Sequence, residues 1–199
     1  MNDSQALERV RAHLLASADA LRRSAETCGP QILAAARMIA SALQAGGKLM
    51  LCGNGGSAAD SQHMAAEYTN RLSADRERRA LAALALTTDT SALTSNANDY
   101  GFEHVFERQV EALGRPGDVF MGISTSGNSE NVLRAMRFCR LHGIATIALS
   151  GGNGGRLQSE AQLSIVVPAA STQHIQEAHA AIGHILCELV ECFLFDRSS

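Results

Sequence analysis

The sequence predicts a single α/β domain in which five parallel strands form one sheet with helices on both faces. Three observations lead to this fold class. Five short apolar runs, each about the length of a buried strand, alternate with helical patterns from residue 47 onward. The chain of 199 residues is long enough for one domain with a substantial core, and no linker or repeat divides it. Aromatic residues make up only 4% of the chain, and small side chains suit helices that pack closely over a sheet.

The N-terminal region, residues 1–46, is predicted to form two helices arranged as a hairpin. Apolar residues such as Leu14 fall near helical spacing in the first helix, and Ser4 is expected to cap it. A second apolar face covers 32–43 and is closed by two consecutive glycines. The α/β core is then expected to occupy 47–199 of a single domain, 1–199.

The core elements are predicted from the change of rhythm after these helices. The predicted strands are 48–52, 82–86, 119–124, 144–150 and 163–167. The predicted helices are 58–72, 90–97, 102–113, 129–142 and a last one over about 175–195. Such alternation is typical of a parallel sheet, and ligands of such sheets bind at the carboxyl ends of the strands.

Composition excludes several classes of function. The net charge is −3 and the pI is about 6.1, so that no basic field draws the chain to nucleic acid. The N-terminus is polar, unlike a signal peptide, and no apolar run approaches the ~20 residues of a membrane helix. The five cysteines are scattered without a CxxC motif, and Cys52 and Cys187 lie in apolar runs. We therefore expect reduced core cysteines, no membrane partner and a cytoplasmic location.

The first unusual loop follows the predicted strand 48–52 and reads Gly53-Asn54-Gly55-Gly56-Ser57. Its glycines allow a tight turn close to a ligand, and the start of the next helix supplies free N–H groups, so that the loop favours a phosphate. A plain strand-to-helix turn is the alternative. The loop with Ala58 also satisfies the loose G-x-G-x-x-A dinucleotide pattern, but no acidic residue is well placed about twenty positions on.

The second loop, after the strand 119–124, reads Ser124-Thr125-Ser126-Gly127-Asn128-Ser129. Four hydroxyls and a glycine at a helix start can surround a phosphate with neutral donors. A helix cap by Asn128 or Ser129 is the simpler alternative, although a cap needs only one such residue. Without a lysine, the loop favours the phosphomonoester of a small molecule.

Candidate catalytic side chains lie on the helices beside these loops. His63 and Glu67 are four residues apart, so that they share one helix face and suit either a divalent metal or acid/base chemistry. A surface ion pair is the alternative. On the last helix, Gln176 shares a face with both His179 and His184, and spacing alone does not choose between the two histidines.

Taken together, the motifs resemble those of the phosphoheptose isomerase family. The residues that carry the resemblance are 53–60 (GNGGSAAD), 62–67 (QHMAAE), 85–89 (ALTTD), 98–102 (NDYGF), 108–114 (RQVEALG), 122–129 (GISTSGNS) and 175–179 (IQEAH). The resemblance covers nearly the whole chain. It implies the sugar isomerase (SIS) fold, a five-stranded parallel sheet between helices, and a homotetramer with active sites between subunits, in which the N-terminal helices take part in oligomer packing.

The resemblance also implies an activity. Members of the family convert sedoheptulose 7-phosphate to D-glycero-D-manno-heptose 7-phosphate through an enediol, the first step toward the heptose of lipopolysaccharide or capsule. By position, Glu67 and His184 correspond to the acid/base pair, and the resemblance thus selects His184 over His179. One Zn²⁺ per subunit is implied, with His63, Glu67, Gln176 and His184 as its ligands. The substrate-binding positions implied are Asn54, Gly55, Gly56, Ser57, Glu67, Arg71, Asn98, Asp99, Ser124, Thr125, Ser126, Ser129 and Gln176.

Three rival functions and two departures from the family pattern accompany this prediction. A related adaptor of the same fold binds the replication initiator protein but lacks the catalytic side chains, whereas Glu67 and His184 are present here. Repressors with this fold carry a helix-turn-helix module, which the non-basic N-terminal helices do not supply. Isomerisation of another sugar phosphate, such as a hexose, is the third rival. Residues 171–174 lack an acidic residue common in relatives, and the charged segment 73–79 is predicted to be a solvated loop.

Overall fold

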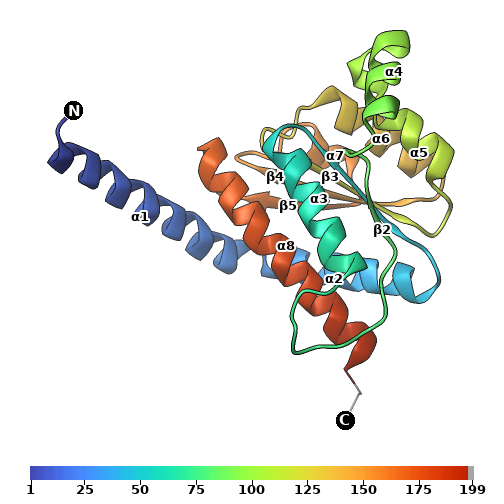
Figure 1. Ribbon diagram of the computed structural model, residues 1–199, viewed down its shortest axis with the longest axis horizontal. Coiled ribbons are helices and arrows are strands. Elements are labelled where there is room, and N and C mark those ends of the chain that lie inside the picture. Colours follow the sequence, from blue (N-terminus) through green and yellow to red (C-terminus); the bar gives the residue numbers. More distant parts are fainter. Residues whose placement is uncertain (197–199) are drawn as a thin grey trace.

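A computed structural model describes residues 1–196 of the protein (Figure 1). Its centre is one sheet of five parallel strands in the order β2-β1-β3-β4-β5. The strands are β1 (Leu49–Gly53), β2 (Ala83–Ala85), β3 (Val119–Ser124), β4 (Ala145–Gly151) and β5 (Leu163–Val167). The predicted fold class is therefore confirmed, and each predicted strand is present within one or two residues of its expected ends.

Helices cover both faces of the sheet. They are α1 (Asp3–Thr27), α2 (Gly29–Gln44), α3 (Gly56–Thr69), α4 (Thr90–Tyr100), the 3₁₀ turn η1 (Phe102–His104), α5 (Glu107–Leu113), α6 (Glu130–Leu141), α7 (Leu157–Glu160) and α8 (Thr172–Phe195). The short α7 was not predicted from the sequence. The predicted helix 102–113 is divided into η1 and α5, because Val105 and Phe106 interrupt the α-helical pattern between them.

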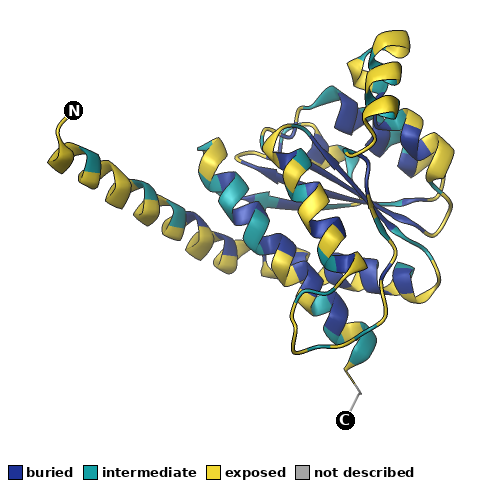
Figure 2. Ribbon diagram, viewed as in Figure 1, coloured by how far each residue is buried: buried dark blue, intermediate teal, exposed yellow. Residues whose placement is uncertain are grey.

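Alternate residues of each central strand point to opposite faces and so divide the core in two. On β1, Leu49 and Leu51 join one apolar cluster, which includes buried residues of α2, α3 and α8. Met50 and Cys52 join the other cluster, which includes buried residues of α5, α6 and α7. Every residue of β1 and β3 is buried, as Figure 2 shows, because both faces of the sheet are covered. Cys52 and Cys187 are free, buried thiols, as predicted.

The two N-terminal helices do not form the expected hairpin. Cys28 alone joins them, and its φ of −100° and ψ of −7° stay in the helical region, so that the chain does not reverse there. As a result α1 projects away from the body in Figure 1, and most of its surface is exposed in Figure 2. Ser4 is not the cap either: Asn2 caps α1, in a reciprocal capping box with Gln5.

The segment 73–79 has no regular structure, but it is not the fully solvated loop that its charge predicts. The side chain of Arg78 is completely buried and pairs with buried Glu191 of α8, with 2.7 Å between Nε and Oε1. Its guanidinium also donates to the carbonyl oxygens of Glu67 and Tyr68 at the end of α3. The loop is therefore tied to both α3 and α8 through one arginine.

The C-terminal helix α8 is by length and composition apolar enough to cross a membrane. In this fold it is a core helix: residues such as Ile175, Ile182 and Leu186 are buried in the cluster that covers one sheet face. This burial within the domain accounts for its apolar character.

Candidate active site

The glycine-rich loop after β1 brings backbone N–H groups to the carboxyl edge of the sheet. Gly55 has a φ of +55°, a conformation that favours glycine, and α3 begins at the next residue. A Cβ added to Gly53 would lie 2.7 Å from the Cβ of Ser57, so that only glycine allows the strand to meet α3 this closely. Ser57 itself is buried. The start of α3 thus offers free N–H groups and a positive helix end, which suit a phosphate.

Gln176 of α8 lies directly against this loop. A Cβ added to Gly56 would be 2.4 Å from Nε2 of Gln176, so that the side-chain amide packs over the first residue of α3. Two residues that are 120 positions apart in the sequence are thereby in contact at the entrance of the site.

The serine-rich loop after β3 lies beside the first loop because β1 and β3 are neighbours. The hydroxyls of Ser124 and Ser129 are 2.9 Å apart, and Ser126 is exposed. Gly127 has a φ of +65°, and a Cβ there would lie 1.9 Å from the carbonyl oxygen of Gly154, so that the loop is packed tightly against the loop after β4. Thr125 is linked to that same segment, because its carbonyl oxygen accepts a hydrogen bond from the amide of Gly151.

A pair of asparagines joins the two loops. The side-chain amides of Asn54 and Asn131 exchange two hydrogen bonds of 2.9 Å each. Asn131 lies in the first turn of α6, directly after the serine loop. The two phosphate-type loops therefore form one rigid edge, which also borders a cavity of about 150 Å³ lined by Asn54, Gly55, Thr87 and Phe106.

Two turns along α3, the predicted chemical groups meet residues of α8. Nε2 of His63 lies 3.1 Å from a carboxylate oxygen of Glu67 and 3.5 Å from Nε2 of His184. One donor atom from each of the three side chains lies within 4.8 Å of the other two. Glu67 is partly buried, whereas His63 is half exposed. The i,i+4 pair predicted from the sequence is thus completed by a histidine from a second helix.

This cluster fits a divalent metal. Nε2 of His63 and Nε2 of His184 face each other at 3.5 Å, and two N–H groups at this distance would repel each other. A shared cation instead accepts the lone pairs of both nitrogens. A carboxylate in the same cluster supplies the negative charge. His63, Glu67 and His184 would hold such an ion, whereas the structure places Gln176 against Gly56.

Two further residues border the cluster: Asp60, which the sequence analysis did not select, and His179, the histidine that the resemblance set aside in favour of His184. Asp60 and His179 line the crevice between α3 and α8 with His63, Glu67 and His184. One carboxylate oxygen of Asp60 is buried without a hydrogen-bond partner, and burial raises the pKa of this group despite nearby His63. Its place at i−3 from His63 was the signal available in the sequence.

His179 has a different environment from His184. It is buried, and its Nε2 lies 3.1 Å from the carbonyl oxygen of Ser150 at the end of β4. Burial lowers the pKa of His179 to about 4, although the contact with Ser150 opposes this shift. The ring is therefore neutral near pH 7 and packs against the sheet, whereas His184 points at His63.

Three predicted substrate-binding residues lie apart from these groups. Asn98 and Asp99 are exposed at the end of α4, and the hydrogen bond of Asn98 goes to Asp99. Arg71 follows α3 and pairs with Glu77 in the neighbouring loop, at 2.7 Å. Within the described residues, none of these hydrogen bonds or ion pairs links the three side chains to the phosphate-type loops.

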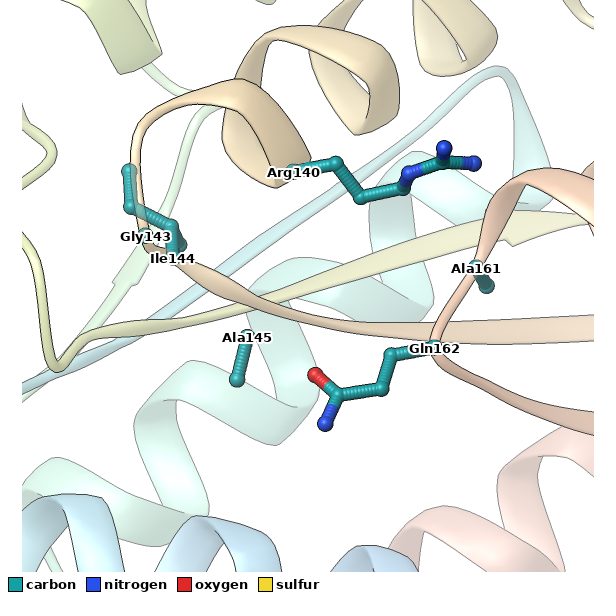
Figure 3. A pocket seen from close by; sticks show the side chains of 6 residues that line it. All are labelled: Arg140, Gly143, Ile144, Ala145, Ala161 and Gln162. Atoms are coloured by element: carbon teal, nitrogen blue, oxygen red, sulfur yellow. The ribbon is translucent and has the colours of Figure 1, made fainter.

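A larger cavity lies away from this site. Figure 3 shows it at the amino ends of β4 and β5, lined by Arg140, Ile144, Ala145 and Gln162, with a volume of about 480 Å³. Arg140 is its only ionisable lining residue, and this arginine lies 3.4 Å from Glu160. The cavity lacks an acid/base pair and lies at the opposite edge from the one at which ligands of parallel sheets bind.

The fold and the two loops define an α/β protein of the sugar isomerase type. Comparison with known families agrees, because the SIS domain model matches residues 13–151. A phosphoheptose isomerase from a Roseiflexus species is 54% identical over 92% of this chain and 91% of its own length, and one from Aquifex aeolicus is 52% identical over 96% and 100%. The solved structure of a phosphoheptose isomerase from Neisseria gonorrhoeae is 44% identical and superposes with a TM-score of 0.87, covering 93% of this chain and 98% of that one.

The chain belongs to the phosphoheptose isomerase family. It is accordingly an isomerase, and the non-catalytic adaptor finds no support among these relatives.

Proposed function

We propose that this enzyme interconverts sedoheptulose 7-phosphate and D-glycero-D-manno-heptose 7-phosphate. The observation that carries the proposal is the meeting of Glu67 and His184 in one cluster, on the two helices that border the phosphate-type loops. The family relatives, which bear the name of this activity, give it further support.

The phosphate of the sugar is assigned to the edge formed by the two loops. Backbone N–H groups at the start of α3 and the hydroxyls of Ser124, Ser126 and Ser129 are neutral donors for a phosphomonoester. Asn54, Gly55, Gly56 and Ser57 belong to the same edge. Glu67 lies further along α3 than these donors, so that the sugar carbons would extend from the phosphate along this helix toward Glu67.

Isomerisation moves a proton between two adjacent carbons. A base removes a proton from C1 of the ketose, the carbonyl oxygen at C2 is protonated to give the enediol, and a proton is then delivered to C2 while the C1 hydroxyl loses its own to give the aldehyde. We assign these transfers to Glu67 and His184, with Glu67 as the base at carbon. The two side chains come from separate helices, α3 and α8.

We extend the proposal to one Zn²⁺ held by His63, Glu67 and His184. Gln176 completes this set only with a change of its side-chain position, since it packs over Gly56 in the structure. When bound, the ion would supply a Lewis acid for the carbonyl oxygen and stabilise the enediolate.

We also propose a homotetramer with active sites between subunits. Two features support it: α1 exposes apolar residues along its length, including Leu7, Val10, Leu14 and Leu15, and the exposed side chain of Asn98 bonds to Asp99 and not to the loops of its own chain. A cytoplasmic location and a role in forming the heptose of lipopolysaccharide or capsule complete the proposal.

The substrate assignment is tested by turnover with two ketose phosphates. Purified enzyme with Zn²⁺ is given sedoheptulose 7-phosphate or fructose 6-phosphate, and aldose formation is followed. We expect conversion of the seven-carbon substrate at a kcat/KM at least about 100-fold higher, a ratio that requires roughly 3 kcal/mol of selective transition-state binding. A preference for the hexose would contradict the proposal.

A further inference from the structure

A second set of metal-binding side chains lies at the junction of α1 and α8. Nε2 of His13 is 2.9 Å from Oε1 of Glu177, and Nδ1 of His174 is 3.0 Å from Oε2 of the same carboxylate. The two imidazole rings have centroids 4.6 Å apart. One donor atom from each residue lies within 4.8 Å of the other two, as in the cluster of His63, Glu67 and His184.

The arrangement differs from a simple surface ion pair because two imidazoles converge on one carboxylate. An ion pair needs only one cationic partner for the carboxylate. Here His174 lies on the same helix as Glu177, whereas His13 lies on α1, 161 positions away from His174. In a tetrahedral zinc site, bonds of about 2.0–2.2 Å place the donor atoms about 3.3 Å apart. The two nitrogen–oxygen distances observed here, 2.9 and 3.0 Å, are near that spacing, and all three donor atoms lie within 4.8 Å of one another.

The surroundings suit a cation with one open coordination position. The side chains of His13 and Glu177 keep 42% and 38% of their surface exposed, whereas His174 keeps only 15%. Both oxygens of the Glu177 carboxylate already face an imidazole nitrogen, which is the arrangement of charge and donors that a cation ligand set requires. Two imidazoles and one carboxylate favour zinc over magnesium or calcium, which prefer oxygen ligands.

This cluster is separate from the proposed active site. The first cluster contains no residue of α1, and Gln176, which precedes Glu177, is turned toward Gly56. Glu177 instead faces α1, where Nε2 of His13 contacts its carboxylate. The cluster therefore lies where the projecting helix is attached to the body.

We propose that His13, His174 and Glu177 bind a second divalent ion, Zn²⁺, that fastens α1 to the N-terminal turns of α8. With water as the fourth ligand, the ion replaces two separate hydrogen bonds by one rigid link. Occupancy of this site then limits the directions that α1 can take.

The test is a zinc titration of the chelator-stripped, full-length protein. Isothermal titration and competition with a chromophoric chelator count the ions per chain. Wild type should bind two ions per chain. In His13→Gln and His174→Gln the affinity of the site at His13, His174 and Glu177 should fall at least about tenfold, so that each variant binds only one ion in the same range of zinc concentration. His184→Gln should lose the other ion and keep this one, so that failure at the two sites can be told apart.

His104→Gln is the matched control. His104 forms the same i,i+3 contact with Glu107 that His174 forms with Glu177, but no second histidine joins it. It should bind zinc as wild type does. Circular dichroism must show the same helix content for every variant compared.

A second readout measures the link itself. In the His184→Gln background, zinc should slow tryptic cleavage at Arg9 and Arg11 of α1, and addition of His13→Gln should abolish that protection. The proposal would be overturned if wild type bound only one ion and His184→Gln bound none. It would also be overturned if both His13→Gln and His174→Gln bound two ions. Cleavage rates that do not respond to zinc would overturn it as well.

Discussion

At the residue scale, two histidines of one helix lie in opposite environments. His184 is exposed toward His63, while His179 is buried against the carbonyl oxygen of Ser150. They are five residues apart on α8, and a rotation of about 100° per residue sends them to different faces. One face of α8 packs on the sheet and the other borders the candidate site. The two histidines therefore differ in environment although they are the same residue type.

The buried histidine makes stability depend on pH. The pKa of His179 is about 4 in the folded chain against an ordinary value of 6.5, so that the unfolded chain binds more protons between these values. The contribution of His179 to the free energy of unfolding should therefore be complete above pH 6.5. It should fall as the pH drops toward 4, by on the order of 3 kcal/mol.

Urea unfolding of the chelator-treated protein at pH 7.5, 6, 5 and 4.5 measures this slope. His179→Gln, which keeps a donor for Ser150 but does not titrate, should be less stable at pH 7.5 and lose part of the slope. Equal slopes for wild type and variant would show that His179 does not control it.

Part of the site could be predicted at this scale. The i,i+4 spacing of His63 and Glu67 is enough to predict that they share one helix face, because this relation is local to α3. The choice between His179 and His184 could not be made from spacing, because it depends on which face of α8 meets β4. The burial of Arg78 against Glu191 depends on a tertiary contact with α8 and was missed for the same reason. Asp60 had a local signal, its place three residues before His63, but its burial beside α8 depends on the fold.

At the element scale, the glycines of the two loops do different work. Gly127 combines a positive φ with a Cβ position 1.9 Å from the carbonyl oxygen of Gly154, whereas Gly55 has a positive φ with open space around it. At Gly127 the packing of two loops leaves no room for a larger residue. At Gly55 only the backbone conformation restricts which residue type is accepted.

The two alanine variants should accordingly differ. Gly55→Ala should cost about 1 kcal/mol of unfolding free energy, since only backbone strain is added. Gly127→Ala should cost more than about 2 kcal/mol, and should raise KM because the serine loop must move. Thermal unfolding and KM measured for both variants check this. A Gly127→Ala protein as stable as Gly55→Ala would contradict the packing argument.

The helices of the N-terminal region show what local patterns leave open. Spacing of apolar residues predicted both α1 and α2, but not the direction of the chain between them. That direction depends on the helical φ and ψ of Cys28. Because α1 contains no glycine or proline, its own sequence neither predicts nor excludes a reversal of the chain. The apolar residues of α1 that were expected to pack in a hairpin are instead exposed.

At the scale of the whole molecule, sheet topology assembles the site. Parallel strands align their carboxyl ends, and β1 lies next to β3, so that two loops about 70 residues apart in the sequence meet at one edge. This much followed from the alternation of strands and helices. The place of Asn98 and Asp99 did not, because their function, as we propose it, depends on a neighbouring subunit.

The exposed face of α1 should control assembly. Leu14 on α1 is 63% exposed, and Leu141 at the end of α6 is 82% exposed. Leu14→Asp should therefore dissociate the tetramer and lower kcat/KM, because burial of a charge in an apolar interface is strongly unfavourable. Leu141→Asp, the matched control, should leave both unchanged.

Light scattering coupled to size-exclusion chromatography gives the mass of each variant. A Leu14→Asp protein with the mass and activity of wild type would rule out α1 as the assembly surface. A monomeric wild type would contradict the tetramer itself.

The central claim is that Glu67 removes the carbon-bound proton, and proton exchange tests it most directly. Sedoheptulose 7-phosphate is incubated in D₂O with zinc-loaded wild type, Glu67→Gln or the exposed control Glu188→Gln, and loss of the C1 proton signal is followed by NMR. We predict rapid exchange with wild type and Glu188→Gln, and exchange about 100- to 10,000-fold slower with a folded Glu67→Gln protein. Exchange by Glu67→Gln within tenfold of wild type would contradict the account and require another residue as the base.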